Sequence, residues 1–214
     1  MCAERAIKRP LIVTDPGLMA TGLVGPLQES TRAICESVSV YTEVTADPSE
    51  SVVLAALEQL QAEQCDGVIG LGGGSSMDVA KAIAVLARGT QVLPELYGVD
   101  KVTGGRLPLV LIPTTAGTGS EVTPVAVITT GETTKAGISA TALLPDVAIL
   151  DAELTVGLPP HVTAMTGIDA MVHAIEAYTS KIKKNPISDM LSRQALKLLA
   201  GNQRRVLSHP TDLQ

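Results

Sequence analysis

The sequence predicts an α/β fold with a mostly parallel sheet, followed by the start of an all-helical domain. Up to Asp151, short apolar runs typical of strands buried on both faces alternate with patterns of helical period. Repeated strand–helix units of this kind favour a parallel sheet with helices on both faces. After Asp151 the strand signals stop, and two long helical patterns follow a Leu-Pro-Pro break at 158–160. We therefore expect two domains, residues 1–157 and 158–214.

The expected elements follow from local pattern in chain order. Strands are expected at 11–13, 37–43, 68–71, 107–112, 125–129 and 146–150, with a further extended segment from Lys135. Helices are expected at about 22–35, from 48 or 49 to 64, from 77 onward, at 160–178 and at 186–200. The segment 89–106 contains glycine and proline and is expected to be a loop.

The bulk composition limits the classes of partner. The chain has 214 residues, 45% of them apolar, and a net charge of −6. This charge gives no reason to expect nucleic acid or an acidic membrane surface as a partner. No apolar run approaches the ~18 residues that would span a bilayer. Cys2, Cys35 and Cys65 lack the spacing of a metal site and are interpreted as free thiols of a reducing compartment, by default the cytoplasm.

The turn after the third expected strand is the first candidate site. Three glycines at 72–74 break the apolar run, and Ser75 and Ser76 are each able to cap the next helix. Asp78 is expected in the first turn of that helix, where the helix dipole favours a carboxylate. Glycines let the backbone approach a phosphate closely, and a helix N-terminus offers it unpaired N–H groups. The pattern matches neither G-x-G-x-x-G nor a Walker A loop, so an ordinary tight turn is the alternative.

Asp15 ends the first expected strand. A carboxylate at that place can accept hydrogen bonds from both hydroxyls of an adenosine ribose. It would also repel a 2′-phosphate, which favours NAD over NADP. The alternative is an aspartate that serves only the turn before Pro16.

Polar residues of two later segments are further candidates. Thr114, Thr115 and Thr118 lie in a loop rich in Gly and Thr, where their hydroxyls would bind phosphate or nicotinamide, or else satisfy their own turns. Lys135 would supply a cation to ribose or phosphate, or else be a plain surface lysine.

Asp169 and His173 form the candidate metal site. They are four residues apart in a helical pattern and therefore share one helix face. A carboxylate and an imidazole suit a divalent transition metal such as Zn²⁺ or Fe²⁺, and Glu176 is within reach of the same face. The spacing alone favours the alternative, a surface ion pair, because a catalytic metal takes about three protein ligands. His161 and His209 are expected to make local or solvent contacts.

Five ordered blocks of sequence resemble the iron-containing, or group III, alcohol dehydrogenases. They are LIVTD at 11–15, GGGSSMDVAKAIA at 72–84, IPTTAGTGSEVTP at 112–124, LPDVAILDAELTVGLPP at 144–160 and TGIDAMVHAIEAYTS at 166–180. The resemblance runs through nearly the whole chain. It implies a dinucleotide-binding α/β domain followed by a helical metal domain, and NAD(P)-linked interconversion of alcohols with aldehydes or ketones. The leading interpretation is an NAD-dependent alcohol dehydrogenase assisted by Fe²⁺ or Zn²⁺.

Carried over by position, the resemblance implies one set of residues for the cofactor and one pair for the metal. The implied NAD contacts are Asp15, Asp47, Gly73, Gly74, Ser75, Thr114, Thr115, Thr118 and Lys135, and the implied metal ligands are Asp169 and His173. Asp47 stands where the family usually has Asn, which keeps a hydrogen-bond acceptor but loses the amide donor. No catalytic acid or base is implied.

The chain departs from the family pattern in length. The family has two further histidine ligands on later helices and an N-terminal hairpin, so we expect a chain truncated at the C-terminus and lacking that hairpin. A truncated nucleotide-binding module without catalysis is therefore one alternative. A related enzyme, such as a glycerol dehydrogenase or a maleylacetate reductase, is another. The family implies a small alcohol or aldehyde as substrate and a homo-oligomer, a dimer or larger.

Overall fold

The chain divides into two units in the computed structural model, which describes residue 2 and residues 5–213. Unit 1 comprises the described residues up to 113 together with 120–150, and unit 2 comprises 114–119 and the described residues from 151. The two units are groups of residues in mutual contact and do not define domains. The domain boundary expected between 157 and 158 therefore stays a prediction. In the part of the chain that is described, no helix combines the length and the apolar character needed to cross a membrane.

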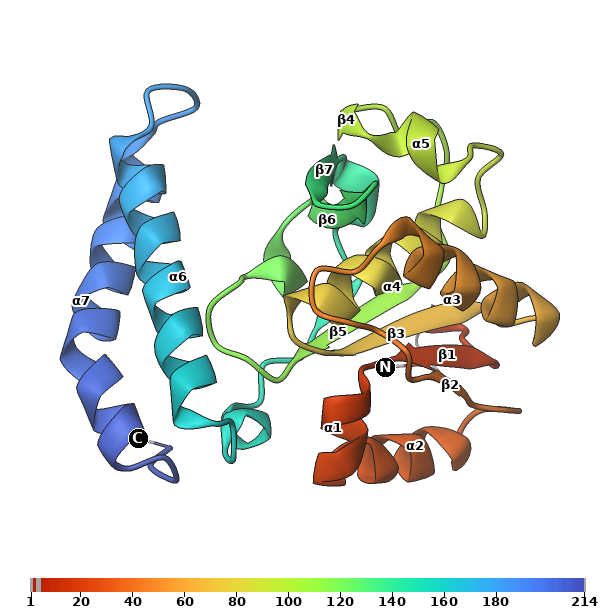
Figure 1. Ribbon diagram of the computed structural model, residues 1–214, viewed down its shortest axis with the longest axis horizontal. Coiled ribbons are helices and arrows are strands. Elements are labelled where there is room, and N and C mark those ends of the chain that lie inside the picture. The colour runs from red at the N-terminus through yellow and green to blue at the C-terminus, as the bar shows by residue number, and fades with distance from the viewer. Residues whose placement is uncertain (1, 3–4, 214) are drawn as a thin grey trace. The chain divides into compact units, whose positions relative to one another are not determined.

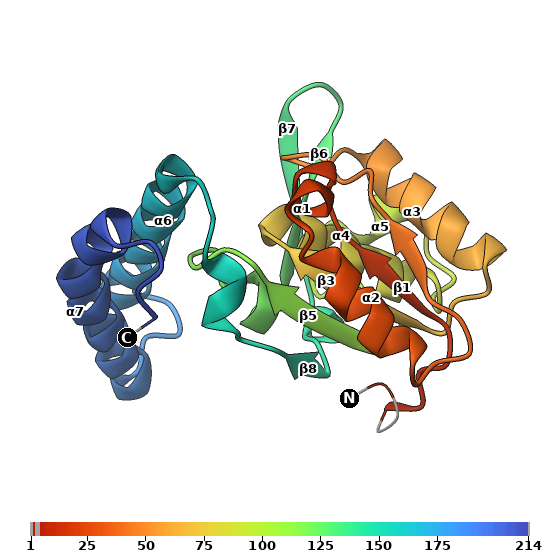
Figure 2. The ribbon, with the colours of Figure 1, turned by 90° about the horizontal axis from the view of Figure 1, so that it is seen from below.

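A five-stranded parallel sheet forms the centre of unit 1, in the order β2-β1-β3-β5-β8. Figure 1 labels β2, β1, β3 and β5, and Figure 2 labels β8. The strands are β1 (Pro10–Val13), β2 (Ser39–Tyr41), β3 (Gly67–Gly72), β5 (Leu109–Pro113) and β8 (Val147–Ala148). Every residue of β1, β3 and β5 is buried, which is the pattern of strands covered on both faces. The predicted α/β fold with a mostly parallel sheet is confirmed.

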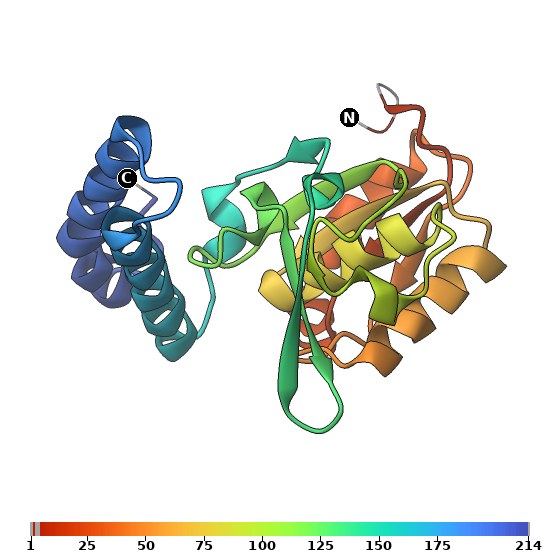
Figure 3. The ribbon, with the colours of Figure 1, turned by 90° about the horizontal axis from the view of Figure 1, so that it is seen from above.

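Helices cover both faces of this sheet. Figure 2 shows α1 (Pro16–Thr21) and α2 (Val24–Arg32) over one face, and Figure 3 shows α3 (Glu50–Ala62) and α4 (Gly74–Leu86), in orange and yellow, over the other. The helix expected at about 22–35 is present as α2, whereas α1 was not expected. Gly22 has a φ of +81° and closes α1 as a left-handed C-cap, so α1 and α2 are separate helices.

A second, three-stranded sheet completes unit 1. Strands β6 (Val125–Thr130) and β7 (Thr134–Ser139) form an antiparallel hairpin, and β4 (Gly98–Val99) pairs with β7. Ala126 and Ile128 of β6 are buried among the core residues that include α4, while their neighbours Val125 and Val127 are exposed. This alternation is typical of a sheet with one face in contact with water. The segment expected as a loop also contains α5 (Leu93–Leu96), and the 3-10 helices η2 (Ser120–Val122) and η3 (Thr141–Leu143) flank the hairpin.

Unit 2 contains η4 (Ala152–Thr155), α6 (Pro160–Thr179) and α7 (Pro186–Ser208). The two long helices were predicted, and α7 continues past its expected end near residue 200. Gly167 permits close packing of the two long helices, because a Cβ there would stand 2.0 Å from Oε1 of Gln203. Gln203 in turn donates to the Thr163 carbonyl at 3.3 Å.

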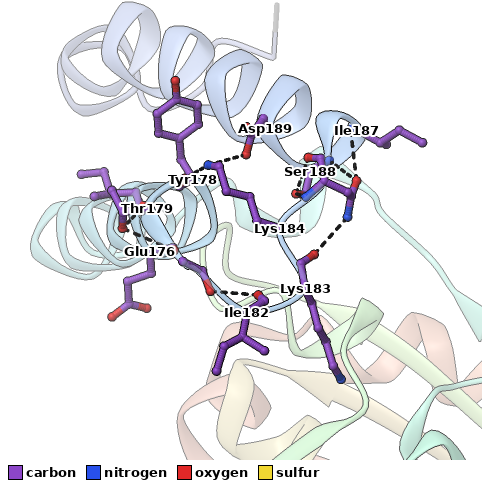
Figure 4. A network of polar contacts seen from close by, with 12 residues as sticks. Glu176, Tyr178, Thr179, Ile182, Lys183, Lys184, Ile187, Ser188 and Asp189 are labelled. Carbon is purple, nitrogen blue, oxygen red and sulfur yellow. Dashed lines mark hydrogen bonds and ion pairs between the residues drawn. The ribbon is translucent and has the colours of Figure 1, made fainter.

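A polar network closes the connection between α6 and α7 (Figure 4). Lys184 Nζ lies 2.8 Å from Asp189 Oδ1 and 4.4 Å from the centre of the Tyr178 ring, and it donates to the Tyr178 carbonyl. The side chain of Asn185 caps α7 by accepting from the N–H groups of Ile187 and Ser188, each at 3.0 Å. The sharp start of α7 therefore follows from an ordinary Asn-Pro N-cap.

Candidate functional site

The strand order places a topological switch point between β1 and β3. From β1 the chain passes through α1 and α2 to β2 on one side, and from β3 it passes through α4 to β5 on the other side. In open parallel sheets, ligands bind outside the carboxyl ends of the strands at such a point. Asp15 follows β1 and Gly73 follows β3. Two of the predicted cofactor residues therefore stand at the place where this topology favours a ligand.

The N-terminus of α4 has no side-chain cap among the described residues. Gly73 is the N-cap and Gly74 begins the helix, so the expectation of a serine cap is wrong. Asp78 lies beyond the first turn, not within it as expected, because the helix starts as early as Gly74. The first-turn N–H groups, at the positive end of the helix, are consequently left for water or an anionic ligand. A pyrophosphate fits this end better than it would fit a capped helix.

Gly72 allows the two strand ends to approach each other. Its φ is +147°, and a Cβ there would lie 2.7 Å from Ser76 Oγ and 3.4 Å from Asp15 Oδ2. Asp15 Oδ1 accepts the Leu18 N–H at 2.9 Å and so caps α1. The structure thus shows the alternative function of Asp15, in which its side chain stabilises the turn before α1 through Oδ1. Oδ2 lies beside Gly72. The proposed ribose contact stays a prediction.

Two buried hydroxyls lack a hydrogen-bond partner among the described residues. They are Thr14 Oγ1, at the carboxyl end of β1, and Thr115 Oγ1, in the Gly/Thr-rich segment. A buried polar group without a partner costs about 1–3 kcal/mol, so such atoms mark places where water or a ligand would bind. Thr115 was among the predicted residues, as were Thr114, which is buried, and Thr118, which is half-buried. Thr14 was not predicted, although its place directly before Asp15 could have indicated it.

Asp47 and Lys135 contact each other. Lys135 Nζ lies 2.6 Å from Asp47 Oδ1, with both side chains more than half exposed. The backbone supports this pair, because the Thr129 N–H donates to the Pro48 carbonyl at 2.8 Å and the Thr129 hydroxyl donates to the Asp47 carbonyl at 3.0 Å. These contacts therefore connect the turn before α3 with the β6–β7 hairpin. Part of the Lys135 charge is neutralised by Asp47.

Asp169 and His173 lie one turn apart on α6. Nε2 of His173 is 3.5 Å from Asp169 Oδ2, and Nδ1 is 3.9 Å from Glu176 Oε2. About half of the Asp169 and His173 side chains is exposed. Among the residues that the structure describes, no three His, Cys, Asp or Glu side chains are grouped so that they could hold a metal. The pair has the right donor chemistry for a divalent metal but supplies two ligands, one fewer than a catalytic site takes.

The two other histidines lie apart from this pair in the sequence. His161 is exposed in the first turn of α6, and His209 follows α7, where its Nδ1 lies 2.9 Å from Ser208 Oγ. The exposed position of His209 matches the expectation of a solvated residue, and the local contact expected of His161 stays a prediction.

A buried polar cluster on α4 was missed by the sequence analysis. The Lys81 side chain is completely buried, and its Nζ lies 3.8 Å from Asp78 Oδ1. Burial lowers the pKa of Lys81 to about 8, although the Asp78 carboxylate acts in the opposite direction. Burial also raises the pKa of Asp78, against the hydrogen bond that Ser120 donates to it. A lysine three residues after an aspartate, within an otherwise apolar helix, was the available signal.

Comparison with known proteins identifies the sequence relatives. Residues 1–152 match the family model described as "Iron-containing alcohol dehydrogenase", and residues 163–214 match "Fe-containing alcohol dehydrogenase family, C-terminal". The chain is 41% identical over 202 residues to the sulfoacetaldehyde reductase of Bilophila wadsworthia, covering 94% of this chain and 52% of that protein. It is 42% identical over 210 residues to the long-chain-alcohol dehydrogenase 1 of Geobacillus thermodenitrificans, covering 97% of this chain and 53% of that protein.

Solved structures give the same relationship. A 1,3-propanediol oxidoreductase matches with a TM-score of 0.95 and 37% identity, over 100% of this chain and 56% of its own. The sulfoacetaldehyde reductase of Bifidobacterium kashiwanohense, solved in complex with NAD⁺, matches with a TM-score of 0.91 and 33% identity, over 99% of this chain and 56% of its own. The chain therefore spans about half the length of the relatives that it matches.

Proposed function

Because the chain belongs to the iron-containing alcohol dehydrogenase family, we propose that its first unit binds NAD and that the protein is an NAD-dependent, metal-assisted alcohol dehydrogenase. The observation that carries the proposal is the switch point between β1 and β3, where Asp15 and the uncapped start of α4 meet at Gly72. The family consists of oxidoreductases that act on alcohols and aldehydes. For this chain, the substrate class is a small alcohol or aldehyde.

The first-turn N–H groups of α4 would hold the pyrophosphate of NAD. Gly74 and Ser75 supply N–H groups there, and Gly73 lets the backbone come close. Asp15 would accept from the adenosine ribose hydroxyls and repel a 2′-phosphate. Asp47, Thr114, Thr115, Thr118 and Lys135 are the remaining proposed contacts. A relative solved with NAD⁺ at 33% identity supports this choice of cofactor.

Asp169 and His173 would supply two of the ligands of a divalent metal, Fe²⁺ or Zn²⁺. When bound, such a metal polarises the substrate oxygen. A metal binds a carboxylate and a neutral imidazole, so protons compete with it for such a pair of ligands. Metal affinity is therefore expected to fall at acid pH.

A nucleotide-binding module without catalysis is the second candidate function. It is favoured by one observation, namely that the described residues offer two metal donors where a catalytic site takes about three. In this case the chain would bind NADH but leave alcohols unchanged.

One sample distinguishes the two candidates. The purified chain is titrated with NADH, followed by fluorescence, and is then assayed for oxidation of short alcohols with added Fe²⁺ or Zn²⁺. Saturable binding with turnover supports the dehydrogenase, and saturable binding without turnover supports the module. Absence of NADH binding would contradict both.

The three cysteines form no disulfide, which supports the proposal that the protein is cytoplasmic. The homo-oligomer stays a prediction.

A further inference from the structure

The completely buried Lys81 ammonium ties α4 to the chain segment that leads into the hairpin. Nζ donates to the Ser120 hydroxyl at 2.8 Å, to the Val125 carbonyl at 2.7 Å and to the Thr123 hydroxyl at 3.4 Å. A lysine ammonium has three N–H donors, so these three acceptors use all of them. The neutral amine has only two, and one of the three acceptors would then lose its donor.

Asp78 completes the same cluster from the preceding turn of α4. Its Oδ1 accepts the Ser120 hydroxyl at 2.6 Å, and its Oδ2 accepts the Val127 N–H at 2.9 Å. Ser120 therefore accepts from Lys81 and donates to Asp78, which fixes the direction of its O–H bond. Glu121 of η2 is the other charged group that acts on Lys81, and the residues of β6 that face it carry no charge.

The segments held by this cluster carry proposed cofactor contacts. Strand β6 pairs with β7 so that Thr129 lies opposite Lys135. Ser120 is the residue at which the segment with Thr114, Thr115 and Thr118 rejoins unit 1. Helix α4 itself begins at Gly74, where the pyrophosphate is proposed to bind. Hydrogen bonds of Lys81 and Asp78 thus connect α4 with the segment 120–127 that leads into the hairpin.

We propose that Lys81 and Asp78 are positioning residues for NAD, which fix the hairpin with Lys135 and the chain at Ser120 to the helix that binds the pyrophosphate. This inference rests on the proposed function, since it needs a dinucleotide at α4. Neither side chain touches the cofactor in this account. Their loss would weaken NADH binding through the segments that they hold.

The charge of Lys81 makes this arrangement dependent on pH. Because its pKa is lowered to about 8 by burial, the third hydrogen bond is lost as the pH rises through that value. The affinity for NADH is then expected to fall between pH 7 and 10. The stability of the fold changes in the other direction. In the unfolded chain Lys81 titrates near 10.5, so the unfolded state binds more protons between about pH 8 and 10.5 and this residue makes stability rise with pH there.

The test measures the dissociation constant of NADH for the 214-residue chain between pH 7 and 10, together with thermal unfolding. Ser120→Ala removes the hydroxyl that joins Lys81 to Asp78 and should weaken NADH binding about tenfold, as for a lost hydrogen bond to a charged group. Ser120→Thr keeps the hydroxyl and should restore affinity. Lys81→Met should abolish the fall in affinity above pH 8, and if it does not fold, the Ser120 variants carry the test alone.

Val53→Ala is the matched control. Val53 is completely buried in α3 and belongs to the same core, so its truncation should lower the unfolding temperature without changing NADH affinity. Equal losses of affinity in Ser120→Ala and Val53→Ala would overturn the inference, because they would reflect stability alone. A wild-type affinity that is constant from pH 7 to 10 would also overturn it. If the wild-type chain binds no NADH at any pH, the proposed function fails first, and the inference fails with it.

Discussion

At the scale of the single residue, Asp15 has an observed role as a helix cap and a proposed role in cofactor choice. One oxygen caps α1 by accepting the Leu18 N–H, and the other lies beside Gly72. The cap requires a hydrogen-bond acceptor, whereas exclusion of a 2′-phosphate requires a negative charge. A substitution that keeps the acceptor and removes the charge therefore separates the fold from cofactor choice.

Asp15→Asn is expected to narrow the preference for NADH over NADPH. The amide oxygen still caps α1, so the unfolding temperature should stay near that of the wild type, whereas Asp15→Ala should lose about 1 kcal/mol of stability. The dissociation constants of both nucleotides and a thermal melt are the measurements. An unchanged ratio of the two constants in Asp15→Asn would contradict the assigned role.

Asp146 gives a prediction about acid stability. Burial acts to raise the pKa of this carboxyl, but hydrogen bonds from Arg106 and from the Leu109 N–H, with the Arg106 charge, outweigh it and lower the pKa. Arg106 Nη1 lies 2.6 Å from Asp146 Oδ2, and both side chains are mostly buried. A lowered native pKa contributes stability above the unfolded value of 3.8, and this stability is lost as the pH falls toward the native value.

Arg106→Met should therefore lower the free energy of unfolding by roughly 2 kcal/mol at pH 7 and flatten its fall between pH 5 and 2. Urea unfolding at a series of pH values measures both effects. Lys8→Met is the control, because Lys8 pairs with Glu36 at 3.3 Å on the open surface, where a pair contributes little. An equal loss in both variants would contradict the account.

At the scale of the element, the start of α4 depends on the backbone conformation of Gly72. Alanine at this position would adopt an unfavourable positive φ and bring its Cβ to 2.7 Å from Ser76 Oγ. Gly72→Ala is expected to cost roughly 3 kcal/mol. Gly137 of β7 is the control, because nothing lies within 4 Å of a Cβ there, and Gly137→Ala should be close to neutral. If chemical denaturation gives both variants the same stability, the strained turn is not a constraint on the fold.

The local sequence pattern predicted those helices and strands that are determined by neighbouring residues along the chain. Strands β1, β3 and β5 were found because strands buried on both faces are continuous apolar runs. Helix α3 was found because Pro48 and Ser49, residues typical of a helix start, directly precede it. The hairpin is different. Its two extended segments were expected, but nothing local shows that β7 pairs with β6 and β4 in a separate sheet and not with β5.

The candidate site also contains residues that local sequence predicted and contacts that it did not. Asp15 and the glycine turn were selected because polar and glycine residues at strand ends are visible in the sequence. The acceptors of Lys81 at Ser120 and Val125 lie 39 and 44 residues away along the chain, so no window of local pattern contains them. The pairing of Asp47 with Lys135 was hidden for the same reason.

At the scale of the whole molecule, α6 carries an exposed apolar stripe. Met165, Ile168, Val172 and Ile175 recur at spacings of three and four residues, and 45–65% of each is exposed. Residues at such spacings share one helix face. Exposed apolar stripes of this kind promote association in water.

The chain is therefore expected to bind the dye ANS and to associate in a concentration-dependent way, measured by sedimentation velocity. Ile168→Lys with Val172→Lys should reduce both effects, while Leu54→Lys, at a half-exposed position of α3, should reduce neither. A wild-type chain that stays monomeric and binds no dye would contradict this prediction.

NAD is proposed to bind at the switch point between β1 and β3. The most direct measurement is an amide-resolved NMR titration of the isotope-labelled chain with NADH. If NAD binds there, saturable shifts should be concentrated at Asp15 and at the residues from Gly72 to Ser76, with much smaller shifts along α7. Saturation with the largest shifts on other elements, or no saturable change at all, would contradict it.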